Sequence, residues 1–230
     1  RFFNWLLATL YAFLFLGSVF IVSAQNYDLF DTYRKYWTIV LGLLFVLSVA
    51  LGVLVTKGKM ELPVDVMLKT VFVTGILESL YAIAQFFKIL PTHNRYYTYT
   101  GSFDNPAVFA MLLSVCIPIA VYYASKREVS NKERWLWRAG AFALLIFICF
   151  SESRSGLIAS LLASLIVLLA AYDVVRRKLF NKRTLLFIIP LAIVMLYLLY
   201  RFKADSANGR LLMWRVCLEM IKERPLFGFG

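Results

Sequence analysis

Histidine and cysteine are scarce in this chain. Its 230 residues include one histidine and three cysteines. Cys116 and Cys149 fall inside apolar stretches, and Cys217 lies in the carboxyl-terminal segment. Their spacing is that of neither a metal site nor a disulfide framework. The sequence therefore offers no zinc site, and no cofactor is predicted.

Charged side chains are also few, and they are unevenly placed. Only 17% of the residues are charged, whereas 61% are hydrophobic, and long windows have no charge at all. A helix that spans a bilayer needs about 17 to 25 apolar residues. The windows show no alternation of period two, so helices are the credible spans. The sequence predicts an all-α polytopic membrane protein and excludes an ordinary soluble domain.

Seven apolar windows predict about seven transmembrane helices. We expect residues 1–200 to form a transmembrane helical bundle, and residues 201–230 to begin a large segment outside it. No internal repeat or low-complexity tract interrupts the chain. The windows are Phe2–Val22, Trp37–Thr56, Val64–Phe87, Pro106–Ala124, Trp135–Phe150, Gly156–Ala171 and Thr184–Tyr200.

The net charge of +12 reflects the loops between these windows. When the loops are assigned alternately to two sides, one side holds 14 of the 25 Lys and Arg residues and the other holds five, and the remaining six lie in the carboxyl-terminal stretch from Arg201 onward. Lys and Arg accumulate in cytoplasmic loops, so the amino end is predicted to be cytoplasmic and the carboxyl end to lie on the opposite side. A nucleic-acid partner would instead need one contiguous basic face, and none is predicted.

Arg154 stands out on the side where cations are rare. It lies between two predicted spans, and a cation held near membrane depth marks a functional site by default. It also opens the sixth predicted helix, where free N–H groups and the helix dipole favour an anion. A guanidinium group binds phosphate through two donors. Arg154 and Arg210, which lies on the same side, predict a pyrophosphate site; the alternatives are a snorkelling Arg154 and a solvated Arg210.

Glu78 is the clearest carboxylate within a predicted span. Thr74, Glu78, Tyr81 and Gln85 recur at helical spacing and share one face. A carboxylate at this depth faces the bundle interior or a wet cavity. Either Glu78 is a hydrogen-bonded packing residue, or its face lines a substrate cavity that opens on the non-cytoplasmic side.

Asn105 ends a polar loop that is rich in tyrosine. Asp104 or Asn105 is predicted to cap the fourth helix, with Pro106 in its first turn. The other interpretation is that Asn105 contacts sugar hydroxyls. Farther on, Ser206 or Asn208 is predicted to cap a helix that runs to about Glu223 and lies along the membrane interface.

Four motifs in order resemble the O-antigen ligase and polymerase superfamily of bacterial inner membranes. They occupy roughly the last 130 residues, and the first hundred resemble it only as generic spans. The motifs are Thr100-Gly101-Ser102-Phe103-Asp104-Asn105-Pro106, Ser153-Arg154-Ser155-Gly156, Gly209-Arg210-Leu211-Leu212-Met213-Trp214 and Pro225-Leu226-Phe227-Gly228-Phe229-Gly230.

The resemblance implies a glycosyltransferase with a helical fold of the glycosyltransferase-C kind, which needs no metal. Such enzymes transfer a glycan from undecaprenyl diphosphate to an acceptor, a lipid A core sugar in the ligases, at the periplasmic face of the inner membrane. Arg154 and Arg210 match the arginines expected to hold the diphosphate. The family's catalytic histidine follows the last motif, so we expect it beyond Gly230 and expect this fragment to be inactive alone; His93 matches no motif.

Other functions stay open at this point. O-antigen polymerases and protein O-oligosaccharyltransferases of the same superfamily differ in their acceptor, which these residues do not encode. Asp28 and Asp31 could hold a divalent ion in a metal-dependent transferase. Glu78 and Arg154 could instead line the route of a small-anion transporter, although transporters usually show repeated halves.

Overall fold

The computed structural model consists of helices joined by turns and loops in the residues that it describes. No strand occurs among them. Seven helices can be followed, of which α1 (Phe2–Phe20) and α2 (Tyr27–Val55) come first. The described residues are 2–20, 27–58, 62–92, 97–103, 105–173, 204–225 and 228, with isolated positions between 174 and 203; side chains at 2, 3, 19, 27–35, 204–207 and 210 are outside the description.

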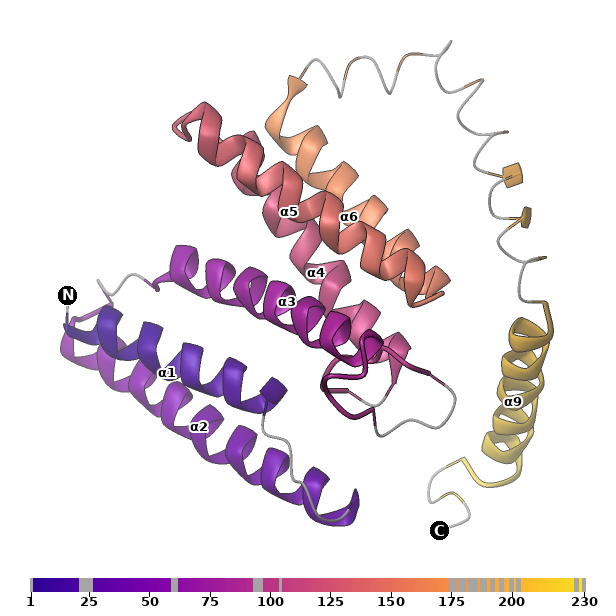
Figure 1. The fold of residues 1–230 in the computed structure, drawn as a ribbon. Coiled ribbons are helices and arrows are strands. Elements are labelled where there is room, and N and C mark those ends of the chain that lie inside the picture. The colour runs from indigo at the N-terminus through magenta and orange to yellow at the C-terminus, as the bar shows by residue number, and fades with distance from the viewer. Residues whose placement is uncertain are drawn as a thin grey trace. The chain divides into compact units, whose positions relative to one another are not determined.

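The chain divides into two units that are described separately. The first unit comprises residues 1–172 and the second residues 173–230. In the first unit, α1 and α2 lie side by side, and α3 (Val64–Phe86) runs past α1 towards α4 (Pro106–Ser125) (Figure 1). The chain continues through α5 (Asn131–Phe150) and α6 (Arg154–Ala171), and both helices pack against α4.

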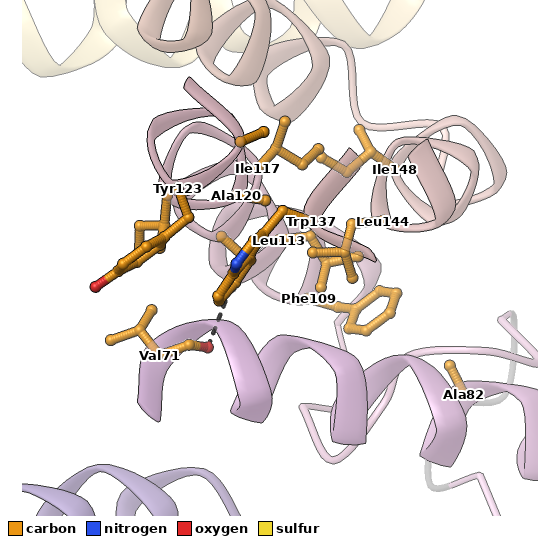
Figure 2. Packing of buried hydrophobic residues seen from close by; sticks show 13 residues of the cluster. Val71, Ala82, Phe109, Leu113, Ile117, Ala120, Tyr123, Trp137, Leu144 and Ile148 are labelled. Carbon is orange, nitrogen blue, oxygen red and sulfur yellow. Dashed lines mark hydrogen bonds between the residues drawn. The ribbon is translucent and has the colours of Figure 1, made fainter. Parts of the chain in front are cut away.

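α4 is the central helix of the first unit. Half of its apolar window is buried inside the protein, whereas 6% of the window Tyr36–Val55 in α2 is buried. Phe109, Leu113 and Tyr123 lie on its inner face and are nearly inaccessible. The Tyr123 ring stacks on that of Trp137 in α5, with ring centroids 4.6 Å apart. Both residues are labelled in Figure 2. Aromatic stacking and close packing therefore hold α4 and α5 together.

The prediction of an all-α polytopic membrane protein is confirmed. Within the described part of the chain, four helices are long and apolar enough to cross a membrane, and a shorter apolar helix covers Asn4–Ser18. α5 is not among the four, because its first two turns contain Lys132, Glu133, Arg134 and Arg138. Most of the seventh predicted window lies outside the described residues, so its span and the boundary at residue 200 stay predictions.

The starts of α2 and of the helix near the carboxyl end come earlier than predicted. α2 starts at Tyr27, ten residues before the window that begins at Trp37. The added turns contain charged residues in the sequence, so hydropathy alone did not include them in the span. α9 (Ala204–Glu223), in the second unit, begins ahead of the caps predicted at Ser206 or Asn208. Its end at Glu223 is as predicted.

Candidate functional site

Arg154 is the first residue of α6 and follows a tight turn. The helix is capped by Ser153, whose Oγ accepts a hydrogen bond from the Gly156 N–H at 3.3 Å. Before the cap, Glu152 has a φ of +53°, which reverses the chain after α5. Arg154 is half-buried. The first N–H groups of a helix have no partner within it, so the guanidinium and the start of α6 both favour an anion here.

The start of α6 lies against the first turns of α4. A Cβ added to Gly156 would be 3.1 Å from the Ala110 Cβ and 3.2 Å from the Ala110 carbonyl oxygen. Gly156 is itself buried. A residue without a side chain lets the two backbones approach closely, as at many helix interfaces in membranes. α4 and α6 therefore begin at the same end of the bundle, which we call the Arg154 end.

The face of α3 that carries Glu78 binds the loop before α4. Glu78 is fully buried, and its Oε2 accepts a hydrogen bond from the Ser102 N–H at 2.8 Å. Two turns farther on, Gln85 Oε1 accepts from the Thr100 N–H at 3.0 Å, and Gln85 Nε2 donates to the Gly101 carbonyl at 2.9 Å. The predicted polar face of α3 is therefore present, and Glu78 and Gln85 on this face bind the backbone of the loop before α4.

Gly101 is required at the centre of this contact for two reasons. Its φ is +63°, in the left-handed region where residues with a side chain are strained. A Cβ at this position would also collide with the Glu78 carboxylate and would meet the Phe109 ring at 3.0 Å. The Thr-Gly-Ser sequence therefore fits the loop tightly onto α3.

Asn105 caps α4, as predicted. Its side-chain Oδ1 accepts a hydrogen bond from the Ala107 N–H at 2.9 Å, and Pro106 occupies the first turn. Asn105 is exposed. Because the cap uses the carbonyl oxygen of the side chain, its NH2 group is on the other branch of the amide, where it can donate to a ligand.

One aromatic side chain joins this loop to the end of α5. The ring centroid of Tyr99 is 6.4 Å from that of Phe86 at the end of α3, and 6.4 Å from that of Phe150. Phe150 is the last residue of α5, directly before the turn that leads to Arg154. The loop and the Arg154 turn are therefore parts of one packed region.

The structure brings three of the four predicted site residues to the Arg154 end of the first unit. Glu78 lies beneath the loop, Asn105 ends it, and Arg154 begins the neighbouring helix. Position 210 belongs to α9 in the second unit, and its side chain is outside the described residues. His93, Asp104 and the side chains of Asp28 and Asp31 are outside them as well.

Comparison with known proteins concerns the carboxyl-terminal part of the chain, which includes Arg154. The family model described as O-Antigen ligase matches residues 139–230. This part of the chain is similar to the O-antigen ligases. No curated protein and no solved structure matches the chain, so the likeness to the glycosyltransferase-C fold stays a prediction.

The O-antigen ligase segment includes the end of α5, all of α6 and α9. Arg154 and Arg210 lie inside it, whereas Glu78 and Asn105 lie before it. The similarity to this family supports glycan transfer as the class of activity, with a lipid-linked glycan and an acceptor as the partners in general terms. The resemblance seen in the motifs is thereby confirmed at the level of the superfamily.

The contacts of Gln85 and Tyr99 were not predicted. The helical spacing predicts that Gln85 belongs to a polar face, but its partners Thr100 and Gly101 are 15 and 16 residues away along the chain. Hydrophobic periodicity places a residue on a face of its own helix and does not name the segment that packs there. The available signal was the Thr100-Gly101-Ser102 sequence, whose glycine between two small polar residues is typical of a tightly bound turn.

Proposed function

We propose that this protein transfers a glycan from undecaprenyl diphosphate to an acceptor hydroxyl, a lipid A core sugar, at the periplasmic face of the bacterial inner membrane. The proposal is supported above all by Arg154, a half-buried arginine at a capped helix start inside the segment that matches the O-antigen ligase family. Such a start stabilises a phosphate group through its N–H donors and dipole.

The role of the arginines is to hold and stabilise the diphosphate. In the transfer, the acceptor oxygen forms a bond to the anomeric carbon of the glycan. The bond from that carbon to the diphosphate oxygen breaks, and the hydroxyl proton passes to a base. Charge that builds up on the departing diphosphate is stabilised by positioned donors, so the proposed chemistry needs no metal. Arg210 is proposed as the second diphosphate ligand from its sequence motif alone.

Asn105 and Glu78 are proposed to belong to the binding site of the glycan. Asn105 is exposed at the Arg154 end, and its side-chain NH2 group can donate to a sugar hydroxyl. Glu78 is buried beneath the same loop. The base that takes the proton is not assigned to any residue of this chain.

The test of this function uses the intact protein in membranes. Arg154→Ala and Arg210→Ala are each expected to abolish transfer and to weaken binding of undecaprenyl diphosphate, while membrane insertion stays normal. Arg154→Lys is expected to restore little activity, because an ammonium group does not reproduce the paired donors of a guanidinium. Arg138→Ala is the matched control: this arginine is exposed and lies over the Trp135 ring in α5.

The result that contradicts the proposal is also specific. Full transfer by Arg154→Lys would remove the two-donor role, and full transfer by both alanine variants would remove the proposed site. Loss of activity in EDTA would show a metal requirement. Transfer to a growing polymer or to a protein hydroxyl instead of lipid A core would assign the chain to a polymerase or a protein O-oligosaccharyltransferase.

A further inference from the structure

Gln85 uses both ends of its side-chain amide on one segment of backbone. Oε1 accepts from the Thr100 N–H at 3.0 Å, and Nε2 donates to the Gly101 carbonyl at 2.9 Å. Nε2 also lies 3.3 Å from the Pro91 carbonyl, at the start of the same loop. The side chain is only 3% exposed. One amide therefore holds the beginning and the end of the loop between α3 and α4.

We propose that Gln85 is a positioning residue for glycan transfer, which acts by fixing the loop that carries Asn105. This inference rests on the proposed function and adds a residue that neither the motifs nor the family match assigns. Gly101 lies four residues before Asn105, and Glu78 holds the intervening Ser102 N–H. Gln85 and Glu78 together form what we call the loop clamp.

The chemistry of the clamp requires an amide at position 85. Thr100 and Gly101 present an N–H and a carbonyl that are buried away from water, and an unmade hydrogen bond on such groups is costly. A neutral amide supplies one donor group and one acceptor in a fixed relation. A carboxylate supplies only acceptors, and an alkyl side chain supplies neither.

The clamped loop also contacts the helix end that leads to Arg154. Tyr99, the residue before Thr100, packs between Phe86 and Phe150. Phe150 precedes the turn that ends at Arg154. A loop released from Gln85 is therefore expected to move Asn105 more than Arg154, because the turn of Arg154 is also held by the Ser153 cap and by the contact between Gly156 and Ala110.

The experiment compares Gln85→Leu with Asn105→Asp in the intact protein. Asn105→Asp keeps a capping oxygen and removes the amide donor. Each variant is expected to raise the KM for an undecaprenyl-diphosphate glycan by about tenfold, with a smaller change in kcat. Asn105→Asp loses the proposed hydrogen bond to the ligand, and Gln85→Leu loses the hydrogen bonds that hold the loop in place for it. If Gln85 acts through Asn105, the KM of the double variant is expected to be no higher than that of the more impaired single variant.

Thr74→Val is the matched control for a buried polar group on the same face of α3. Thr74 is fully buried, and its Oγ1 donates to the Thr70 carbonyl at 2.9 Å within the helix. Its KM is expected to equal that of the wild type. Should Gln85→Leu insert poorly into the membrane, Gln85→Glu takes its place, since it keeps the acceptor for Thr100.

Two outcomes separate this inference from the function on which it rests. If Gln85→Leu leaves KM unchanged, or if its effect and that of Asn105→Asp multiply in the double variant, Gln85 does not act through Asn105, and the proposed function still stands on Arg154. If Arg154→Ala transfers normally, the proposed function itself fails, whatever Gln85 does.

Discussion

At the scale of single residues, Asn105 combines a structural contact with a proposed ligand contact. Its Oδ1 caps α4, whereas the proposed function uses its NH2 group. Asp and Asn are nearly equal as helix caps, but alanine loses about 1 kcal/mol at such a position. We expect Asn105→Asp to keep the stability of the wild type and to transfer with the raised KM given above, and Asn105→Ala to show the same raised KM together with lower stability. Thermal unfolding in detergent and a transfer assay measure the two effects. Normal transfer by Asn105→Asp would show that Asn105 only caps α4 and does not contact the ligand.

Glu152 provides a second prediction at this scale. Its φ of +53° lies in the left-handed region, which costs a residue with a side chain roughly 1 kcal/mol relative to glycine. We expect Glu152→Gly to unfold at a higher temperature than Glu152→Ala, which removes the same charge and keeps the strain. Equal stability of the two variants would show that the turn is not strained.

The residues of the site differ in how far the sequence predicts them. The cap at Asn105, Pro106 in the first turn of α4 and Arg154 at the start of α6 are confirmed, because capping depends on neighbours within a few positions. The partners of Glu78 and Gln85 in the Thr-Gly-Ser segment are 15 to 24 residues away. Local pattern contains no information on such pairs, and the structure was needed to find them.

At the scale of helices, hydropathy predicts some boundaries closely and misses others. The window Val64–Phe87 agrees with α3 (Val64–Phe86) because Pro63 and the end of the apolar run coincide with the ends of the helix. α5 begins four residues before its predicted window, where Ser130 caps the helix and Glu133 follows in its first turn. Hydropathy detects residues that lipid can surround, whereas hydrogen bonding and caps decide where a helix begins.

The pairing of α4 with α6 yields a prediction at the scale of elements. Gly156 leaves no room for a larger side chain beside Ala110. We expect Gly156→Leu to push the start of α6 away from α4, displace Arg154 and reduce transfer at least tenfold, since misplacement by about 1 Å can cost a hundredfold in rate. Transfer kinetics test this. Gly42→Leu in α2 is the control, since a Cβ there meets nothing within 4 Å, and a normal rate for Gly156→Leu would contradict the prediction.

At the opposite end of the bundle, a charged network joins α3 to α4. Asp65 accepts hydrogen bonds from the Tyr123 hydroxyl at 2.7 Å and from Lys126 Nζ at 3.2 Å, and it pairs with Lys69 at 2.9 Å. We expect Asp65→Asn to lower stability by about 1 kcal/mol, because Asp65 is half exposed and exposed ion pairs contribute little. Transfer should stay normal, since the network is far along α3 from Glu78. Thermal unfolding measures the loss, and a large loss of transfer at unchanged stability would contradict it.

At the scale of the whole molecule, the helices differ in how much of their surface is buried by protein. This difference distinguishes the helices in the interior of the bundle from those expected to face lipid. α4 is half buried within the first unit, whereas the window Tyr36–Val55 is 6% buried and contains no charged residue. In a membrane, hydrocarbon covers such a surface without loss. The proposed site therefore uses the helices around α4, and α2 contributes mainly to the membrane-embedded surface.

Orientation in the membrane is the prediction that ties the site to the proposed reaction. Cations crowd the loops at the end where α4 finishes and α5 begins, so that end is predicted to be cytoplasmic and the Arg154 end periplasmic. Glu128 and Glu152 are exposed in turns at the two ends. With Cys149 and Cys217 replaced by serine, Glu152→Cys should react with a membrane-impermeant maleimide added to spheroplasts, and Glu128→Cys should react only after the membrane is opened. The reverse pattern would place Arg154 on the cytoplasmic side, away from a periplasmic acceptor, and the proposed transfer could not occur there.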